Sequence, residues 1–407
     1  MKILFLTSRL PWPLDKGDKL RAFHQIRHLA QEHDVYLFSL VDSKPTEEAL
    51  AALTPFVREV HTETLGNVRR WVRMAGAVFS SRPFQVHWFF QRSAMRALQQ
   101  WERSVQPDVI YCQLIRMAEY VKGHHATPRV LDYMDALSAG IARQSNLAPP
   151  YLRWVYRLEY RRLRAYESAV FDYFDGQTII SEADRKLIAH PEQDRIRVIP
   201  NGIDTSHFQP VPGSIEKSRL PPTLLFTGNM SYPPNVDAAV QLVEQVLPKL
   251  KTPNVHLIIA GTEPDAQVQR LATDRVRITG WIPDIREAYQ AADVFVAPLR
   301  IGTGQQNKIL EAMSMELPCV TTPHVRSGFP INGSDAPPMR IGESAEQLAI
   351  QIDSLLSHPE ERGNLGRLSR VWVEKHCNWS QTVAELAHTF VNSTYDQPVE
   401  TLWNNTI

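Results

Sequence analysis

The amino-acid sequence predicts an α/β protein made of two domains, each with a doubly wound parallel sheet. Both halves alternate short apolar runs with stretches of helical periodicity, the pattern of a parallel sheet covered by helices. A chain of 407 residues is too long for one ordinary hydrophobic core. A polar, proline-bearing segment at 205–222 separates the two series and is the expected linker. We therefore expect two Rossmann-like domains that face each other across a cleft.

Six apolar runs of the first half are predicted strands. They are Ile3–Leu6, Val35–Leu40, Val109–Cys112, Val130–Tyr133, Gln177–Ile180 and Ile196–Ile199. Helical periodicity lies between them at Leu20–Gln31 and Tyr151–Asp172. Pro200, Asn201 and Gly202 end the series, so we place the first domain at 1–204.

The second half repeats this alternation. Its predicted strands are Leu224–Thr227, Val255–Ala260, Val276–Thr279, Val294–Ala297 and Cys319–Thr322. Its predicted helices are Val236–Leu250, Ile285–Gln290, a segment from about Gln305 to Met315, and Trp379–Val391. We assign 223–378 to the second domain, and 379–407 to a last helix and a polar tail.

The segment 293–322 is the most informative one. A buried strand runs into a turn with Gly302 and Gly304, and a helix follows. The free N–H groups and the dipole of a helix N-terminus favour a phosphate there. Lys308 can reach that phosphate, and Glu311, three residues on, shares its face of the helix. A carboxylate beside a phosphate site suits ribose hydroxyls, so the pattern predicts a nucleotide site.

The same segment resembles the donor-site signature of the family 4 retaining glycosyltransferases. The resemblance rests on Arg300, Gln306-Asn307-Lys308 and Leu310-Glu311-Ala312-Met313. More narrowly, these residues resemble a bacterial exopolysaccharide-associated (PEP-CTERM/EpsH-type) sugar transferase subgroup. The family pattern has two glutamates; Glu311 fills the second position and Thr303 stands at the first. Arg300 or Lys308 is then expected to do part of the first glutamate's work.

The resemblance implies the GT-B fold, with the last helix crossing back to the first domain, and a nucleoside-diphosphate sugar as donor, UDP- or GDP-linked. It also implies that Lys308 and Arg300 stabilise the departing diphosphate and that the backbone near Ile309 and Leu310 approaches it. The expected catalytic residues are Lys308, Arg300 and Asp135. The expected donor-binding residues are Glu311, Gly302, Thr303, Gly304, Asn307, Ile309, Leu310, Gly228, Asn229, Gly261, Trp281, Ile282, Gly17 and Asp18.

Several of these assignments leave an alternative open. The loop with Gly228 and Asn229 reaches the donor or is a structural turn, because the arginine–lysine pair that often follows in relatives is missing. Trp281 stacks on the nucleobase or belongs to the core. Gly17 and Asp18 resemble the glycine loop that faces the donor across the cleft.

Two features of the first half are equally open. Asp135 follows the strand Val130–Tyr133 and either orients the acceptor hydroxyl or caps the next helix. Arg21 and His24 share a helix face that lines the cleft or is simply solvated.

Charge and composition bound the partners. Lys plus Arg and Asp plus Glu both number 44, so no nucleic-acid partner is implied. Residues 61–170 nevertheless hold 16 basic against 8 acidic residues, a net charge of +8. The arginine-rich helix Tyr151–Asp172 is a solvated face or makes loose contact with an anionic membrane surface.

Three widely spaced cysteines and the absence of a long apolar run indicate a cytoplasmic protein, at most peripheral at the inner face of the plasma membrane. No Asp-x-Asp, HExxH or paired CxxC occurs, so no metal and no further cofactor is expected.

We therefore expect a metal-independent retaining glycosyltransferase that moves a sugar to a glycan or polyprenyl-linked acceptor in exopolysaccharide or cell-surface polysaccharide synthesis. Two alternatives remain: a GT-B-fold sugar-nucleotide epimerase, and a catalytically silent subunit of a polysaccharide assembly complex. Thr303 at the first glutamate position keeps the silent subunit open. A nicotinamide dehydrogenase is disfavoured, because no G-x-G-x-x-G follows the first strand.

Overall fold

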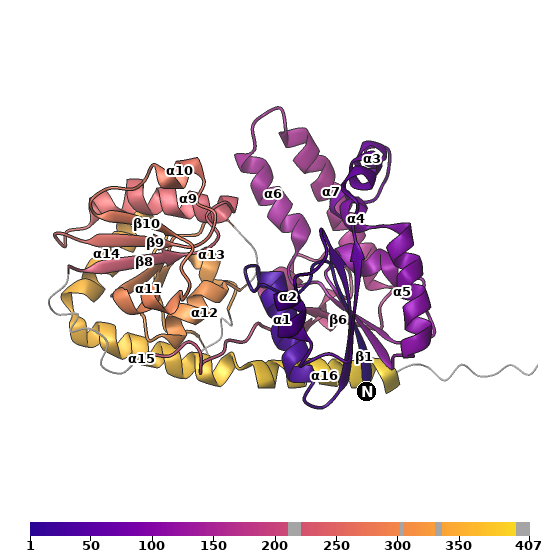
Figure 1. Ribbon diagram of the computed structural model, residues 1–407. Helices are drawn as coiled ribbons and strands as arrows, with labels where there is room; N and C mark the ends of the chain where they lie inside the picture. Colours follow the sequence, from indigo (N-terminus) through magenta and orange to yellow (C-terminus); the bar gives the residue numbers. More distant parts are fainter. Residues whose placement is uncertain (211–220, 302–304, 330–335, 396–407) are drawn as a thin grey trace, which may run out of the picture.

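The chain folds around two separate parallel sheets, one in each half (Figure 1). The computed structural model describes residues 1–210, 221–301, 305–329 and 336–395. The sheets have seven and six strands, and helices cover both. This is the GT-B architecture that the alternating pattern and the resemblance predict.

The first sheet has the strand order β3-β2-β1-β4-β5-β6-β7, and all its pairs are parallel. Chain order reverses between β1 and β4, which makes this the switch point of the sheet. The strands are β1 (Lys2–Thr7), β2 (Asp34–Val41), β3 (Glu59–Thr64), β4 (Val109–Gln113), β5 (Arg129–Asp132), β6 (Gly176–Ile179) and β7 (Arg197–Val198).

Helices connect these strands and cover both faces of the sheet. They are α1 (Gly17–Leu29), α2 (Glu47–Leu53), α3 (Asn67–Ala77), α4 (Phe84–Phe89), α5 (Arg92–Val105), α6 (Leu137–Leu147), α7 (Arg153–Phe171) and α8 (Glu182–Arg185), with 3-10 turns η1 (Ile115–Tyr120) and η2 (Gln193–Arg195). Alternate residues of each strand point to opposite faces. Ile3 and Phe5 of β1 therefore pack against α1 and α2, whereas Leu4 and Leu6 pack toward α5 and α7.

The second sheet has the order β10-β9-β8-β11-β12-β13, and its switch point lies between β8 and β11. The strands are β8 (Thr223–Thr227), β9 (His256–Ala260), β10 (Val276–Gly280), β11 (Val294–Ala297), β12 (Cys319–Thr321) and β13 (Arg340–Ile341). The helices are α9 (Pro233–Gln241), α10 (Ala266–Gln269), α11 (Arg286–Ala291), α12 (Asn307–Ser314), α13 (Pro323–Arg326), α14 (Ala345–Ser357), α15 (Pro359–His376) and α16 (Trp379–Tyr395).

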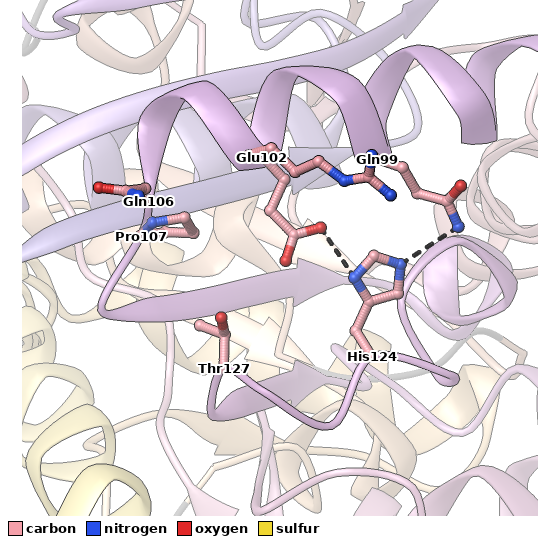
Figure 2. A pocket seen from close by; sticks show the side chains of 7 residues that line it. Gln99, Glu102, Gln106, Pro107, His124 and Thr127 are labelled. Carbon is pink, nitrogen blue, oxygen red and sulfur yellow. Dashed lines mark hydrogen bonds and ion pairs between the residues drawn. The ribbon is translucent and has the colours of Figure 1, made fainter.

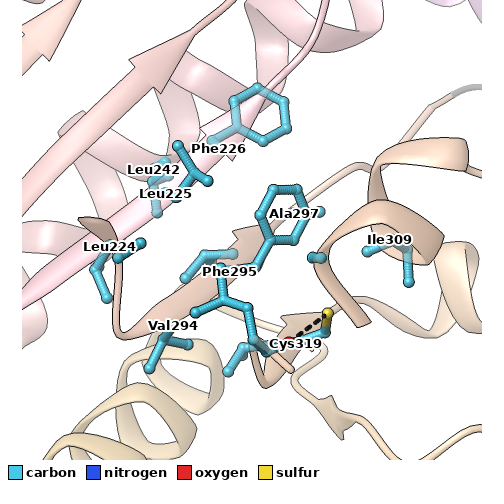
Figure 3. Close-up of a cluster of buried hydrophobic side chains, with 14 of the residues drawn as sticks. Leu224, Leu225, Phe226, Leu242, Val294, Phe295, Ala297, Ile309 and Cys319 are labelled. Atoms are coloured by element: carbon cyan, nitrogen blue, oxygen red, sulfur yellow. Dashed lines mark hydrogen bonds between the residues drawn. The ribbon is translucent and has the colours of Figure 1, made fainter. Parts of the chain in front are cut away.

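One buried cluster forms the core of the second half. Figure 3 shows Leu224, Phe226, Val294 and Phe295 of β8 and β11 packed near Ile309 of α12. α12 therefore anchors its apolar face in the core next to the switch point. Its other face, with Lys308 and Glu311, is left for the loops at the strand ends.

The end of the chain returns to the first half. α16 packs against α1, β5 and β6, and Trp379, Leu386 and Phe390 join the core of the first sheet. Figure 1 shows α15 beneath the second sheet and α16 beneath the first. The start of α16 passes close to the backbone at Gly202, because a Cβ on this glycine would lie 2.6 Å from the backbone nitrogen of Trp379.

The helix predicted at Val236–Leu250 is not uniform. α9 ends at Gln241 and continues as a π-helical turn (Leu242–Val246) and a 3-10 turn (Leu247–Lys249). Strands β3 and β13 were not predicted. β3 lies at the edge of its sheet and its sequence, EVHTET, contains no apolar run, and β13 has only two residues.

Candidate functional site

A cleft of about 890 Å³ opens between the two halves at the carboxyl ends of both sets of strands. Ligands of doubly wound sheets bind at such edges, beside the switch point. Eleven of the predicted site residues line it: Lys308, Glu311, Asn307, Gly228, Asn229, Gly261, Trp281, Ile282, Gly17, Asp18 and Asp135.

Lys308 lies in the first turn of α12, half-buried in this cleft. Its Nζ donates a hydrogen bond to Oδ1 of Asn235 at 2.5 Å and lies 4.8 Å from the centre of the Phe226 ring. Burial lowers the pKa of Lys308 to about 7, although the carboxylate of Glu311 acts in the opposite direction. The lysine is therefore poised to gain its full charge when an anion arrives.

Glu311 is held in place by a residue that the sequence did not single out. Its Oε2 accepts a hydrogen bond from the Tyr289 hydroxyl at 2.7 Å, and that hydroxyl lies 3.0 Å from Oγ1 of Thr227. Burial raises the pKa of Glu311, while the Tyr289 bond and Lys308 lower it. The carboxylate is thus fixed at the cleft wall. Its Oε1 makes no hydrogen bond with the residues that the structure describes, so it can accept one from a ligand hydroxyl.

Two glycines bring backbone close to this pair. Gly228 has φ +155° and Gly261 has φ +142°, conformations that side chains rarely adopt. A Cβ on Gly228 would lie 2.9 Å from Nζ of Lys308, and one on Gly261 would lie 1.8 Å from the carbonyl oxygen of Gly228. The two loops therefore require glycine in order to pack behind Lys308.

We expect Gly261→Ala to destabilise the protein by ~1–3 kcal/mol, because it adds a direct clash to a strained backbone. The measurement is the free energy of unfolding in urea. Gly76→Ala is the matched control, since a Cβ there meets nothing within 4 Å and helical alanine is favoured over glycine. Equal stability of wild type and Gly261→Ala would contradict the assigned packing.

Asn307 joins the two halves as well as lining the cleft. Its Oδ1 accepts a hydrogen bond from Nδ2 of Asn201 at 3.0 Å, and the backbone N–H of Asn201 donates to Oε1 of Gln305 at 2.8 Å. Arg21 donates to Oδ1 of the same Asn201 at 2.8 Å and to Asp132 at 2.7 Å. A polar chain therefore runs from β5 of the first sheet to the start of α12.

That chain corrects the expectation for Arg21 and His24. Arg21 is fully buried and neither lines the cleft nor faces solvent. His24 stacks on Trp379 of α16 with ring centres 5.0 Å apart, and burial lowers its pKa to about 4. Both alternatives were wrong because polar and aromatic partners reach this helix face from distant segments.

Asp135 lies in the loop between β5 and α6, where it lines the cleft from the side of the first sheet. The cap residue of α6 is Ala136, without a side-chain cap, so the helix-cap alternative for Asp135 is wrong. The preceding Met134 has φ +62°, an uncommon conformation that clusters at functional loops. Gly17 and Asp18 begin α1 nearby, and Asp18 pairs with Arg9 at 2.9 Å.

Trp281 is 68% exposed and lines the cleft, so the alternative that placed it in the core is wrong. It follows β10 beside Ile282, at the far edge of the second sheet. Its indole is accessible to a planar ligand. Whether it stacks on a nucleobase stays a prediction.

Among the described residues, the predicted site residues Arg300, Ile309 and Leu310 do not line the cleft. Arg300 is exposed, and its guanidinium donates two hydrogen bonds to the carboxylate of Asp237 on α9, from Nε at 3.1 Å and from Nη2 at 2.5 Å. The side chains of Ile309 and Leu310 are fully buried in the core, and the Ile309 N–H donates to the Gln306 carbonyl. Gly302, Thr303 and Gly304 lie outside the described residues.

A second hollow, of about 640 Å³, lies on the first half beside α5. Figure 2 shows His124 between Glu102 and Gln99, with an ion pair of 2.7 Å to Glu102. It holds none of the predicted residues. In the described ranges, no group of three His, Cys, Asp or Glu residues could hold a metal ion, and no helix is long and apolar enough to cross a membrane.

The fold and cleft define the class of GT-B glycosyltransferases, and comparison with known proteins agrees. Solved structures with the same fold include HepE from Anabaena in complex with UDP (15% identity, 96% of this chain and 100% of that one, TM-score 0.69) and sucrose-phosphate synthase from Thermosynechococcus elongatus (16%, 96% and 98%, 0.70). WaaG, a glycosyltransferase involved in lipopolysaccharide biosynthesis, is also similar (17%, 95% and 99%, 0.62). No curated protein sequence matches the chain.

Two family descriptions match the chain side by side. "Glycosyltransferase Family 4" matches residues 20–207, and "Glycosyl transferases group 1" matches residues 221–358. The chain belongs to the family 4 (group 1) glycosyltransferases, enzymes that transfer a sugar from a nucleotide sugar.

Proposed function

We propose that this glycosyltransferase takes a UDP- or GDP-linked sugar and transfers it, with retention, to a glycan or polyprenyl-linked acceptor in exopolysaccharide or cell-surface polysaccharide synthesis. The observation that carries the donor site is the pair Lys308 and Glu311, side by side in the cleft at the start of α12. HepE binds UDP and UDP-glucose with a similar fold, which supports UDP as the nucleotide.

In this proposal the second domain (223–378) binds the donor and the first domain (1–204) binds the acceptor. The linker (205–222) joins them, and the last segment (379–407), which begins with α16, returns to the first domain. Lys308 meets the charge that develops on the departing diphosphate, together with backbone N–H groups at the start of α12 and of residues 302–304. Arg300 adds to this only if its ion pair with Asp237 opens when the donor binds. Glu311 accepts hydrogen bonds from the ribose hydroxyls.

Asp135 faces this pair from the opposite wall of the cleft. We assign to it the orientation of the acceptor hydroxyl, because a carboxylate that lines the acceptor side can accept the hydroxyl proton. Closure of the two halves would exclude water, which otherwise hydrolyses the donor.

Donor affinity is expected to depend on pH through Lys308. Its pKa is about 7 in the free protein, and a bound diphosphate raises it, so binding takes up a proton. The gain in affinity is complete below pH 7 and is lost as pH rises through the pKa of the complex. Calorimetric titration with the nucleoside diphosphate from pH 6 to 10 should show this fall in affinity, and Lys308→Met should make the affinity depend less on pH. A wild-type profile no steeper than that of the variant would contradict the assignment.

Incubation of the purified protein with labelled nucleotide sugars, with and without a bacterial lipid extract, tests the reaction. We expect label to enter the lipid fraction only when protein and extract are both present. Without acceptor, a transferase slowly releases free sugar and nucleoside diphosphate, whereas an epimerase returns an altered nucleotide sugar. Donor binding without either product would support the silent subunit instead.

We further propose that the first domain docks on the inner face of an anionic membrane. Exposed arginines lie along α7 at three- and four-residue spacing: Arg153, Arg157, Arg161 and Arg164. Exposed aromatic side chains lie at the start of α7 and in the loop after α3: Tyr151 (72% exposed), Trp154 (61%) and Phe79 (93%). Arg162 binds the carbonyls of Ala77 and Val78, which ties that loop to α7. Figure 1 shows α3, α6 and α7 projecting on one side of the first sheet.

The charge reversal Arg157→Glu with Arg161→Glu should weaken binding to phosphatidylglycerol vesicles at least tenfold, since each basic residue near such a surface contributes ~1 kcal/mol. Sedimentation with vesicles measures this. Lys186→Glu, at an exposed lysine of the same half, is the control. Wild-type binding that is equal on neutral and anionic vesicles would contradict the proposal.

A further inference from the structure

One buried cation in the cleft makes no hydrogen bond or ion pair with the residues that the structure describes, and it has no role in the donor site. Arg116, in the turn η1 after β4, is 9% exposed and lines the cleft. Its Nε is buried without a hydrogen-bond partner, and within the described ranges no hydrogen bond or ion pair is made by this side chain. Its guanidinium carbon lies 4.8 Å from the centre of the Phe89 ring. Burial lowers the pKa of Arg116 to about 10, and Arg9 adds to that effect.

A second arginine gathers at the same ring. Arg9 follows β1, and its guanidinium carbon lies 5.7 Å from the Phe89 centre. Its ion pair with Asp18 uses one guanidinium nitrogen, Nη1, which lies 2.9 Å from the carboxylate oxygen Oδ2. Two like charges therefore converge in a half-buried place where each disfavours the other. Asp18, which pairs with Arg9, and Asp135 both act on Arg116 through space and favour its charged form, but among the described residues neither makes an ion pair with it.

The position of this pair is that of a ligand site. β1 and β4 flank the switch point of the first sheet, and Arg9 and Arg116 follow these two strands at their carboxyl ends. Asp135 follows the next strand, β5. A buried cation without a counter-ion is costly, and an anion that enters the cleft would remove that cost.

We infer that Arg116 and Arg9 form an oxyanion subsite for the acceptor, so that the acceptor carries an anionic group close to the hydroxyl that receives the sugar. The group is a phosphate, a diphosphate or a sugar carboxylate, all of which suit the planar donors of a guanidinium. The inference rests on the proposed function, because it gives the acceptor to the first domain, opposite the donor site at Lys308. It narrows the acceptor class to charged sugars or glycosyl phosphates and disfavours neutral glycans.

The test is calorimetric titration of the full-length protein already saturated with UDP, or with the nucleotide that binds best, in phosphate-free buffer. The probes are inorganic pyrophosphate, glucuronate and methyl glucoside as the uncharged control. We expect one of the two anions to bind the loaded protein and methyl glucoside not to bind. The stronger anion distinguishes a phosphate-bearing acceptor from a carboxylate-bearing one. If neither anion binds the nucleotide-loaded protein, the inference is overturned.

Arg116→Gln should weaken binding of the anion at least tenfold and change the affinity for the nucleotide less than twofold. Arg96→Gln, at an exposed position of α5, should match the wild type. Unchanged anion affinity in Arg116→Gln would overturn the inference, whereas failure of the wild type to bind any nucleotide would overturn the proposed function instead.

A thermal-unfolding measurement separates binding from packing. Removing an uncompensated buried charge should leave the Tm of Arg116→Gln equal to or above that of the wild type. A lower Tm together with unchanged anion binding would assign the guanidinium to packing on Phe89 alone. If Arg116→Gln does not fold, Arg9→Gln serves as the second variant. Arg9 is partly exposed, and its replacement should also weaken binding of the anion.

Discussion

Lys308→Ala is expected to lower kcat by ~100-fold while the KM for the donor changes only a few-fold. The reason is that a preorganised donor aimed at charge that develops in the transition state affects turnover more than ground-state binding, typically by 10²–10³. Lys308 is held for this task by Asn235 and the Phe226 ring, and burial keeps its pKa near neutrality. Steady-state kinetics with the preferred donor measure both constants.

Lys186→Ala is the matched control, because that lysine is exposed and lies in the first half, away from the cleft. Lys308→Met tests the charge at nearly constant side-chain length, and it should resemble Lys308→Ala. If kcat is unchanged in both Lys308 variants, Lys308 does not stabilise the departing diphosphate.

Glu311→Ala should weaken binding of the nucleotide about tenfold or more, since a hydrogen bond to a charged group contributes ~1.5–3 kcal/mol. The variant also deprives the Tyr289 hydroxyl of its acceptor at 2.7 Å. Tyr289→Phe therefore serves as the companion variant. It removes the hydrogen bond that holds the Glu311 carboxylate but keeps the carboxylate itself, so nucleotide affinity should fall less than in Glu311→Ala. Calorimetric titration with the nucleoside diphosphate gives the affinities.

A deoxy nucleotide identifies the contact itself. If Glu311 holds the ribose, the wild type should lose affinity for 2′-deoxy or 3′-deoxy UDP, and Glu311→Ala should bind the deoxy and parent nucleotides equally well. A variant that still discriminates between them would place the ribose elsewhere in the cleft.

The strands were predictable from the sequence where they are buried on both faces. β1, β2, β4 and β8 read as continuous apolar runs because helices cover both sides of a parallel sheet. β3 was missed because it is an edge strand whose residues are nearly all polar, so it carries no such signal. The uneven helix after α9 was also beyond prediction, since its apolar periodicity continues through the π-helical and 3-10 turns.

The donor side of the site was largely predictable because glycine marks loops that approach a ligand. Gly228 and Gly261 line the cleft as expected, and their positive φ angles explain the residue type. The supporting residues could not be found in this way. Tyr289 and Asn235 are ordinary residues whose roles arise from packing across more than one element, and no local pattern distinguishes them.

The first half was harder to interpret for the same reason. The sequence around Arg21 indicates only an amphipathic helix, whereas its partners Asp132 and Asn201 arrive from distant loops. Arg116 likewise lies in a short turn without a motif, and only the fold brings it beside Arg9. Residues that a tertiary arrangement brings together are invisible to spacing along the chain.

The most direct test of the central claim, that the cleft beside α12 binds a nucleotide sugar, is a thermal-shift screen against UDP-, GDP-, ADP- and TDP-sugars, repeated with Glu311→Ala. A ligand at a hundred times its Kd stabilises a protein by ~2.7 kcal/mol, which raises Tm measurably. We expect a rise in Tm with one nucleotide class, and this rise should be reduced or lost in Glu311→Ala. No rise with any nucleotide sugar, or a rise of equal size in the variant, would contradict the claim.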